Sequence, residues 1–291
     1  MAVDLEIIIV NFQSTDHILG CLKSLYDSLG GIRTTVFIQD NGSTDGVDRI
    51  EEHFPQVHLH RNRTNIGFAA AVNKVVRKGD APFILLLNPD TTVSPGLLQE
   101  TLALMEKSPH TAIIGPRVLD GDGRLQASAR RFPNALTALF GRQSLLSRLW
   151  PNNRFTRINL TAHTCTDQDP IAVDWVSGAC MLVRREAVAK VGLMDENFFM
   201  YWEDADWCRR MRLKGWQVVY DPRATVIHHT AQSSRKKPVR SAYAFHRSVY
   251  HYFIKYDQGR RWYLHPMICM GLLARLLMVV AIIQIKKALY K

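Results

Sequence analysis

Three acidic side chains follow an aromatic run late in the chain, at Glu203, Asp204 and Asp206. The run itself, residues 198–202, reads Phe-Phe-Met-Tyr-Trp. If a helix begins near Glu203, these carboxylates lie at its positive N-terminus, where negative charge is stabilised. A carboxylate walled by aromatic rings could serve as a general base beside an acceptor pocket. Capping of a helix by acidic residues explains the same pattern, so this segment alone leaves both interpretations open.

A further acidic turn, Asn88-Pro89-Asp90, follows the apolar run Phe83–Leu87. A carboxylate at the end of a strand can bind a hard divalent cation, which also coordinates phosphate oxygens. An ordinary turn of the same sequence is the simpler alternative. The strand pattern Ala224–His228 ends in the pair His228-His229, and one of these imidazoles could complete the ligand set of the cation.

The first third of the chain supplies a scaffold for such a site, because strand and helix patterns alternate along it. Apolar and β-branched runs predict strands at Leu5–Val10, Thr35–Gln39, Val57–Leu59 and Phe83–Leu87. Helical periodicity predicts helices between them, at Asp16–Leu29, Asp45–His53 and Phe68–Lys78. This alternation predicts an α/β fold with a mostly parallel sheet and helices on both faces.

Small and polar residues follow each of the four predicted strands, in turns that begin at Asn11, Asp40, Asn62 and Asn88. Ligands bind parallel sheets at the carboxyl ends of the strands, so four such turns predict one binding site. Asp40 could accept a hydrogen bond from a base or a ribose hydroxyl. The first strand is not followed by Gly-x-Gly-x-x-Gly, which argues against a nicotinamide dinucleotide as the ligand.

The net charge of +11 comes entirely from the end of the chain. Residues 231–291 hold twelve Lys or Arg and one acid, so the remaining 25 basic and 25 acidic residues cancel. Such a block favours an anionic partner, either lipid head groups or nucleic acid. Residues 266–285 are apolar except for Arg275 and Gln284. This pattern favours a helix lying in a membrane surface with its basic side chains toward the head groups, and nucleic acid is not expected. A helix buried in the protein or in an oligomer contact is the alternative.

Five cysteines, at positions 21, 165, 180, 208 and 269, form no CxxC pair. This usage favours a reducing compartment in which the thiols are mostly buried. The run Leu5–Val10 is flanked by Asp4 and contains Glu6, whereas a signal peptide would carry basic residues there. We therefore expect a cytoplasmic protein, peripheral on the inner face of the cell membrane.

Taken together, the motifs resemble those of the inverting family-2 glycosyltransferases of the GT-A fold, especially the rhamnosyltransferase-like branch. The matching stretches occur in the family's order, at Ile7–Phe12, Asp40–Gly46, Asn65–Asn73, Leu86–Thr91, Arg130–Pro133, Trp175–Met181, Gly192–Arg209 and Val226–Ser233. The resemblance implies a GT-A domain over residues 1–234, with a nucleotide-sugar-binding half at 1–115 and an acceptor and catalytic half at 116–234. Residues 235–291 would form a basic helical tail.

The resemblance also implies roles for single residues. Donor binding falls to Asn11, Asp40, Asn41, Asn65, Gly67, Asn88 and Asp90, of which Asp40 and Asn65 contact the nucleoside. Asp90 and His228 would hold Mg²⁺ or Mn²⁺, although Asn88 replaces the first acid of the family's Asp-x-Asp motif. Thr230 and Ala231 replace the glycines of its histidine motif, so His229 is an alternative to His228 as the metal ligand. Asp204 would be the catalytic base, with Glu203 beside it. The sugar and acceptor side would be lined by Trp175, Ser177, Gly178 and Ala179.

The implied reaction is a single displacement that moves a sugar from a nucleoside diphosphate to a hydroxyl group, in cell-envelope glycan synthesis. dTDP-rhamnose is the donor that the branch suggests, with UDP- and GDP-sugars as alternatives, and the acceptor would be lipid-linked or a polysaccharide. An oligomer is compatible with this function. The competing hypotheses are a basic nucleic-acid-binding protein and a glycan-binding protein without activity. Retention of Asp90, Glu203 and Asp204 argues against the second of these.

Overall fold

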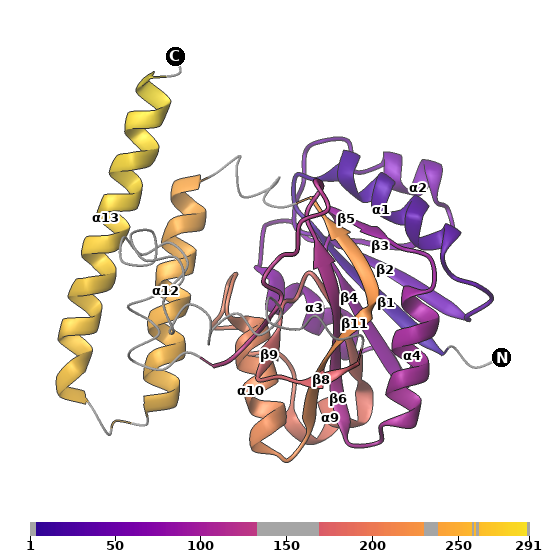
Figure 1. Cartoon of the computed structure of the whole chain (residues 1–291). Helices are drawn as coiled ribbons and strands as arrows, with labels where there is room; N and C mark the ends of the chain where they lie inside the picture. Colours follow the sequence, from indigo (N-terminus) through magenta and orange to yellow (C-terminus); the bar gives the residue numbers. More distant parts are fainter. Residues whose placement is uncertain (1–3, 133–168, 230–237, 258, 260–261, 290–291) are drawn as a thin grey trace.

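A single mixed sheet forms the centre of the protein (Figure 1). The computed structural model describes residues 4–132, 169–229, 238–257, 259 and 262–289. The sheet has nine strands in the order β3-β2-β1-β4-β10-β6-β11-β5, with β8 paired to β11. Their bounds are β1 Leu5–Asn11, β2 Thr34–Asp40, β3 His58–Arg61, β4 Phe83–Leu87, β5 Thr91–Val93, β6 Thr111–Leu119, β8 Ile171–Ala172, β10 Cys180–Arg184 and β11 Gln217–His228.

The first half of the chain builds the parallel part of this sheet. β3, β2, β1 and β4 are all parallel, in agreement with the α/β alternation of the sequence. β10 then runs antiparallel between β4 and β6, while β11 is parallel to β6. A separate pair is formed by β7 (Ala129–Arg130) and β9 (Trp175–Val176). The sheet therefore includes strands from both the first and the second half of the chain.

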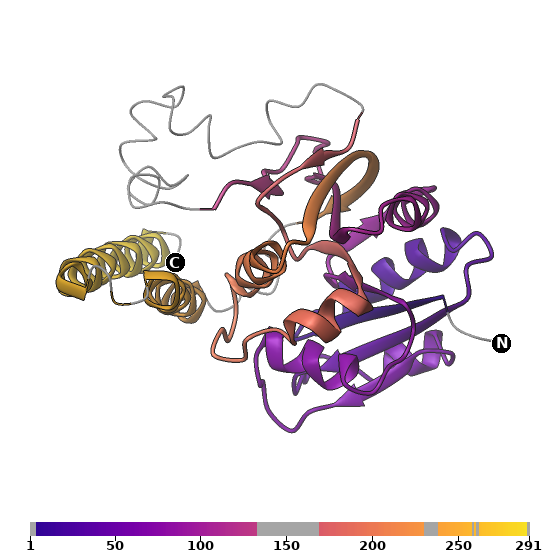
Figure 2. The same ribbon diagram turned by 90° about the horizontal axis from the view of Figure 1, so that it is seen from below.

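Helices cover both faces of the sheet, as Figure 2 shows from below. Alternate residues of β1 point to opposite faces, because the side-chain period of a strand is two. Ile7 and Ile9 pack with one group of helices, and Ile8 packs with the other. The first group is α1 (Thr15–Asp27), α2 (Arg49–His53) and α4 (Leu97–Lys107), and the second is α3 (Phe68–Val76), α9 (Arg185–Val191) and α10 (Glu203–Leu213).

The element boundaries lie close to the sequence prediction except at three places, and the first is β11, which begins at Gln217 rather than at Ala224. The helix expected at Asp45–His53 begins only at Arg49, because the preceding residues form turns in which Gly46 has a φ of 81°. The Asp45 carboxylate instead accepts hydrogen bonds from the Thr15 amide (2.9 Å) and hydroxyl (2.8 Å), and so caps α1. The third strand lies at His58–Arg61 rather than Val57–Leu59.

Two long helices form the end of the chain and lie side by side in both views (Figures 1 and 2). α12 spans Pro238–Asp257, as the proline predicts, and α13 spans His265–Leu289 after the short 3-10 turn η1 (Trp262–Leu264). Six basic residues of the tail lie outside the described residues, namely Arg235, Lys236, Lys237, Arg260, Arg261 and Lys291.

α13 is long and apolar enough to cross a membrane, judged by length and composition alone. Its most apolar stretch has a mean hydropathy of 2.4, and none of that stretch is buried. The sequence led us to expect that Arg275 would point toward lipid head groups, but its side chain points elsewhere. Its guanidinium lies 5.7 Å from the ring centroid of Phe245 on α12. The basic residue inside the apolar stretch is therefore directed toward the protein, and the exposed side of α13 is apolar.

Three of the four described cysteines, Cys21, Cys180 and Cys208, are buried and free, whereas Cys269 is exposed on α13. Burial raises the pKa of Cys21 to about 12. The buried thiols therefore stay protonated and unreactive, in line with the absence of a CxxC pair in the sequence.

Candidate active site

The carboxyl ends of β1 and β2 bring Asn11 and Asp40 together, since the two residues are in register in the parallel pair. The Asn11 amide donates to Asp40 Oδ1 at 2.9 Å. Asp40 Oδ2 accepts the backbone N–H groups of Gly42 (3.0 Å) and Ser43 (2.9 Å). Both side chains are almost fully buried. Asp40 therefore orders the loop that follows its own strand, and this loop forms one wall of the expected donor site.

Asn41, Asn65 and Gly67 form the adjacent wall. The Asn41 amide donates to the Gly67 carbonyl at 3.1 Å, and Asn65 Oδ1 accepts the Gly67 N–H at 2.9 Å. Gly67 has a φ of 89°, and a Cβ added there would lie 2.6 Å from the carbonyl oxygen of Phe199. The Phe68 N–H donates to that same carbonyl at 2.9 Å. Only glycine fits this position, which joins the expected donor side to the aromatic segment before the acidic residues.

Asp90 and His228 meet at the edge of the sheet, where β5 pairs with the end of β11. The His228 Nε2 atom lies 3.2 Å from Asp90 Oδ1 and 3.3 Å from the Asn88 amide nitrogen. The Nδ1 atom of His228 lies 3.1 Å from Gln126 Oε1, while the Gln126 amide donates to the His228 carbonyl at 2.8 Å. Since Gln126 Oε1 can only accept, Nδ1 carries a proton, and Nε2 is the ring nitrogen that faces Asp90.

This donor set fits a divalent cation. A carboxylate oxygen suits both Mg²⁺ and Mn²⁺, whereas an imidazole nitrogen suits a transition-metal ion better than Mg²⁺. Two ligands about 2.1 Å from an octahedral ion and at right angles are about 3 Å apart, which matches the separation of Nε2 and Oδ1. Burial raises the pKa of Asp90, but the adjacent imidazole more than offsets this and the pKa lies below its usual value. The carboxylate is therefore charged at neutral pH.

His229 lies elsewhere. Its Nε2 atom is 3.1 Å from the hydroxyl of Thr92, and its backbone N–H donates to the Asp90 carbonyl at 2.9 Å. Within the histidine pair, His228 is the one whose ring is against the Asp90 carboxylate. His228 ends β11, and strand alternation predicts the ring of the following residue, His229, on the other face.

Glu203 and Asp204 lie in the first turn of α10, which begins at Glu203 as predicted. Asp204 Oδ2 accepts the Gly178 N–H at 3.0 Å, and Oδ1 accepts the Ala205 N–H at 2.8 Å. Burial raises the pKa of Asp204, even though these N–H groups and the charge of Arg130 oppose the shift. Burial and the charge of Asp204 raise the pKa of Glu203 well above its usual value. A carboxylate with a raised pKa is a stronger base than a solvent-exposed one.

The segment Trp175–Ala179 connects these two acidic sites. The Asn88 N–H donates to the Ala179 carbonyl at 2.9 Å, and the next residue, Gly178, donates to Asp204. Trp175 stacks on Trp202 with ring centroids 6.4 Å apart. The Ser177 hydroxyl accepts the Ala179 N–H at 3.3 Å. Two backbone hydrogen bonds, at Ala179 and Gly178, thus connect the turn that contains Asp90 with Asp204, which is far from it in the sequence.

Two residues near these groups had no assigned role in the sequence. Gln126 orients His228, and a single glutamine in an irregular segment gives no signal that could have revealed it. Arg130 lies with its guanidinium 5.1 Å from the Trp175 ring centroid, and its charge acts on Asp204. Arg130 is the first residue of Arg130–Pro133, one of the stretches that carry the family resemblance. The sequence therefore pointed to this position but assigned no role to its side chain.

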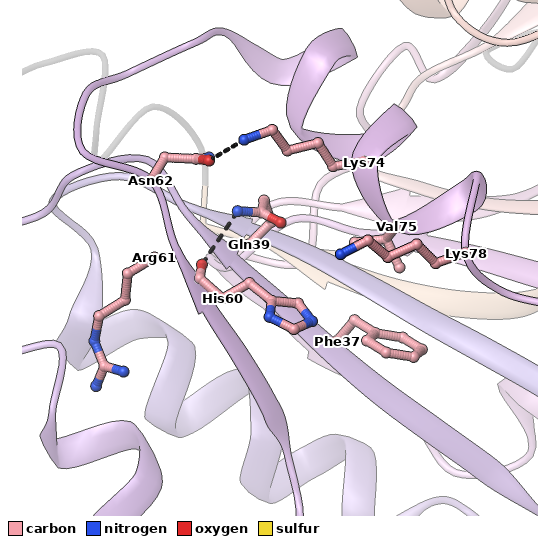
Figure 3. A pocket seen from close by; sticks show the side chains of 8 residues that line it. All are labelled: Phe37, Gln39, His60, Arg61, Asn62, Lys74, Val75 and Lys78. Carbon is pink, nitrogen blue, oxygen red and sulfur yellow. Dashed lines mark hydrogen bonds between the residues drawn. The ribbon is translucent and has the colours of Figure 1, made fainter.

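A small cavity lies elsewhere, between α3 and the strands β2 and β3 (Figure 3). Its volume is about 150 Å³, and it is lined by Phe37, Gln39, His60, Arg61, Asn62, Lys74, Val75 and Lys78. Lys74 donates to Asn62 at 2.6 Å across its rim. None of the expected site residues lines this cavity, which is separate from the acidic residues described above.

A family model described as Glycosyl transferase family 2 matches residues 6–192, a span that includes the donor walls, Asp90 and the Trp175–Ala179 segment. The chain belongs to this family. In this glycosyltransferase, hydrogen bonds from Asn88 to Ala179 and from Gly178 to Asp204 connect the turn after β4 with the start of α10.

Similar proteins carry related activities in their names. The chain is 33% identical, over 90% of its length and 87% of the relative, to an N-acetylglucosaminyl-diphospho-decaprenol L-rhamnosyltransferase of Mycobacterium tuberculosis. It is 24% identical to the rhamnosyltransferase WbbL of Escherichia coli, over 79% of this chain and 84% of that protein. Both of these relatives are named as rhamnosyltransferases.

Solved structures confirm the GT-A fold of this glycosyltransferase. A mannosyltransferase of Pyrobaculum calidifontis in complex with GDP-Man and Mn²⁺ matches 99% of this chain and 81% of its own, at 13% identity and a TM-score of 0.57. GalNAc-T7 with UDP, GalNAc and Mn²⁺ matches 78% of this chain and 44% of its own, at 15% identity and a TM-score of 0.59.

Proposed function

We propose that this glycosyltransferase moves rhamnose from dTDP-rhamnose to a hydroxyl of a lipid-linked or polysaccharide acceptor in cell-envelope glycan synthesis. The choice of sugar rests on the mycobacterial relative, which is similar over most of both chains. The observation that carries the catalytic part is the position of Asp204, a partly buried carboxylate that accepts the Gly178 N–H, next to the residue whose carbonyl accepts the Asn88 N–H.

The donor lies across the carboxyl ends of β1, β2 and β4. Asp40 and Asn65 contact the nucleoside, and Asn11, Asn41 and Gly67 shape its pocket through the hydrogen bonds described above. Trp175, Ser177, Gly178 and Ala179 line the sugar and the acceptor. The aromatic rings of Trp175 and Trp202 exclude water from this side, which keeps the basicity of Asp204 high.

The reaction is one in-line displacement. Asp204 accepts the proton of the acceptor hydroxyl while that oxygen forms its bond to the anomeric carbon. The bond from the anomeric carbon to the phosphate oxygen breaks, and its electron pair leaves with the diphosphate. Because there is a single attack from the opposite face, the anomeric configuration inverts. Burial and the adjacent negative charge of Asp204 both raise the pKa of Glu203, which is buried next to it.

Asp90 and His228 would hold Mg²⁺ or Mn²⁺, and Asn88 adds a hydrogen bond to the same imidazole. A bound cation would neutralise the charge that gathers on the leaving diphosphate. Gln126 keeps the proton of His228 on Nδ1. The Mn²⁺ in two solved structures of the same fold supports this assignment.

The C-terminal tail, residues 235–291, brings the enzyme to the inner face of the cell membrane from the cytoplasm. The exposed side of α13 presents Met267, Met270, Leu273, Leu277, Met278, Ile282 and Ile285. These side chains suit contact with acyl chains, and basic residues of the tail add about 1 kcal/mol each near an anionic surface. A peripheral protein would be extracted from membranes by alkaline carbonate, whereas a spanning helix would stay with the lipid.

The test is a panel of dTDP-, UDP- and GDP-sugars with a polyprenyl-diphosphate-linked N-acetylglucosamine acceptor, with and without Mn²⁺. Transfer from dTDP-rhamnose with inversion, measured by NMR of the product, is the expected result. Transfer only from a UDP- or GDP-sugar would overturn the choice of donor, and retained configuration would overturn the mechanism. Binding to DNA but not to anionic vesicles at matched salt would favour the nucleic-acid hypothesis instead.

A further inference from the structure

Helix α12 lies against the segment that carries Glu203 and Asp204, as both views show (Figures 1 and 2). The Ser248 hydroxyl donates to the Met200 carbonyl at 3.0 Å, and Ser248 is buried. The Tyr252 ring lies 5.0 Å from the ring of Trp202, centroid to centroid. The tail therefore contacts the residues immediately before the two acids.

The backbone of this segment adopts a conformation that its residues rarely take. Tyr201 and Trp202 both have a φ of 71°, in the left-handed region. Bulky residues avoid that region, and two of them in succession persist only where their surroundings hold them. Trp202 is also the N-cap residue of α10, and its side chain makes no capping hydrogen bond. Contacts from outside α10 must therefore hold this turn.

α12 supplies such contacts. The Phe245 ring lies 5.8 Å from the Tyr201 ring and 6.2 Å from the Trp202 ring, while Tyr252 lies on Trp202. Tyr252 is almost fully buried and forms a small core with Phe198 and Ala205, which flank the acidic residues in the sequence. Both left-handed residues, Tyr201 and Trp202, therefore contact aromatic side chains of α12.

Charged groups fix the next part of α10. Asp206 is completely buried and accepts hydrogen bonds from the Tyr256 hydroxyl and the Arg210 guanidinium. Lys255 Nζ lies 2.7 Å from Asp206 Oδ1 and 2.7 Å from Asp195 Oδ2. A buried ion pair of this kind resists separation, because either partner left alone would be a charge without water. α12 therefore contacts the first turn of α10 on both sides of Asp204, at Trp202 and at Asp206.

We propose that Ser248 and Tyr252 are positioning residues for the transfer reaction: by holding residues 200–202 they set the direction in which Asp204 points toward the acceptor hydroxyl. The inference rests on the proposed function, in which Asp204 is the base. It makes the tail a part of the catalytic unit in addition to its contact with the membrane.

The test compares four variants of the full-length enzyme with dTDP-rhamnose at saturating acceptor. Tyr252→Ala removes the ring on Trp202 and is expected to lower kcat by about 10- to 100-fold, as a displaced catalytic group does, with the donor KM unchanged. Tyr252→Phe keeps the ring and should restore kcat. Ser248→Ala removes one hydrogen bond and should lower kcat by about 3- to 10-fold. Tyr243→Ala is the matched control, since Tyr243 is 58% exposed on the same helix.

Asp204→Asn is measured in parallel to separate the base role of Asp204 from the positioning role of Ser248 and Tyr252. Loss of transfer in Asp204→Asn with wild-type kcat in both Tyr252→Ala and Ser248→Ala would overturn the positioning role and leave the base intact. Retained transfer in Asp204→Asn would overturn the base assignment itself. A rise in donor KM that matches the fall in kcat would mean a general structural defect and would also overturn positioning. If Tyr252→Ala does not fold, as judged by its thermal transition, Ser248→Ala decides alone.

Discussion

Gln126 offers the sharpest test of the proposed cation site, because it touches His228 and not the cation. Gln126→Leu keeps the size of the side chain and removes its hydrogen bonds to His228 Nδ1 (3.1 Å) and to the His228 carbonyl (2.8 Å). The first bond holds a proton on Nδ1 and so leaves Nε2, the nitrogen next to Asp90, as the one that would bind a cation. A neutral hydrogen bond contributes about 1 kcal/mol net, which corresponds to roughly fivefold, and loss of the tautomer preference adds to this. Groups that orient a metal-bound histidine typically change affinity by about 10- to 100-fold.

We therefore expect Gln126→Leu to weaken Mn²⁺ binding about tenfold. The assay is the titration of free Mn²⁺ by electron paramagnetic resonance in the presence of dTDP, which reads binding without turnover. Gln217→Leu serves as the control, because Gln217 is exposed at the opposite end of the same strand, β11. His228→Ala should weaken binding further, since it removes the ligand.

An unchanged Mn²⁺ affinity in Gln126→Leu, together with a large loss in His228→Ala, would refute the tautomer argument but keep the ligand. Unchanged affinity in both variants would remove His228 from the site. In that case the 3.2 Å contact between His228 and Asp90 would be a structural ion pair.

Three further predictions concern the acids and the donor wall. Asp204→Asn should lower transfer by about 10²- to 10⁴-fold while calorimetry still detects dTDP binding, and turnover near the wild-type rate would assign the base elsewhere. Burial raises the pKa of Asp204, so the folded protein holds this proton at pH values where the unfolded chain has released it. The stability of the wild type relative to Asp204→Asn, measured by urea unfolding, should therefore fall as the pH rises from about 4 to 7, and a constant difference would contradict the shift. Gly67→Ala should lower the melting temperature and the donor affinity more than Gly215→Ala, because both glycines have a positive φ but only at Gly67 would a Cβ meet a carbonyl, at 2.6 Å.

Much of the fold follows from local patterns in the sequence. The strands β1 and β4 are short apolar runs ended by polar turns, and α12 begins at Pro238, where the fixed φ of proline suits the first turn of a helix. The start of α10 at Glu203 was likewise predicted from the acids that stabilise its N-terminus. Each of these signals depends on residues within one or two turns of each other, so the sequence is sufficient to locate them.

The tertiary structure decided what depends on contacts between distant segments. Strand periodicity put His228 and His229 on opposite faces, but only the pairing of β11 with β5 placed His228 against Asp90. Gln126 reaches His228 from a segment without regular periodicity, so no local pattern could reveal it. The charge and apolar pattern of the tail predicted a membrane partner, yet the contact of α12 with Trp202 arises from side chains about fifty positions apart, as in Ser248 and Met200. Such contacts are selected by the packing of the whole chain, because the local sequence of either partner is compatible with many neighbours.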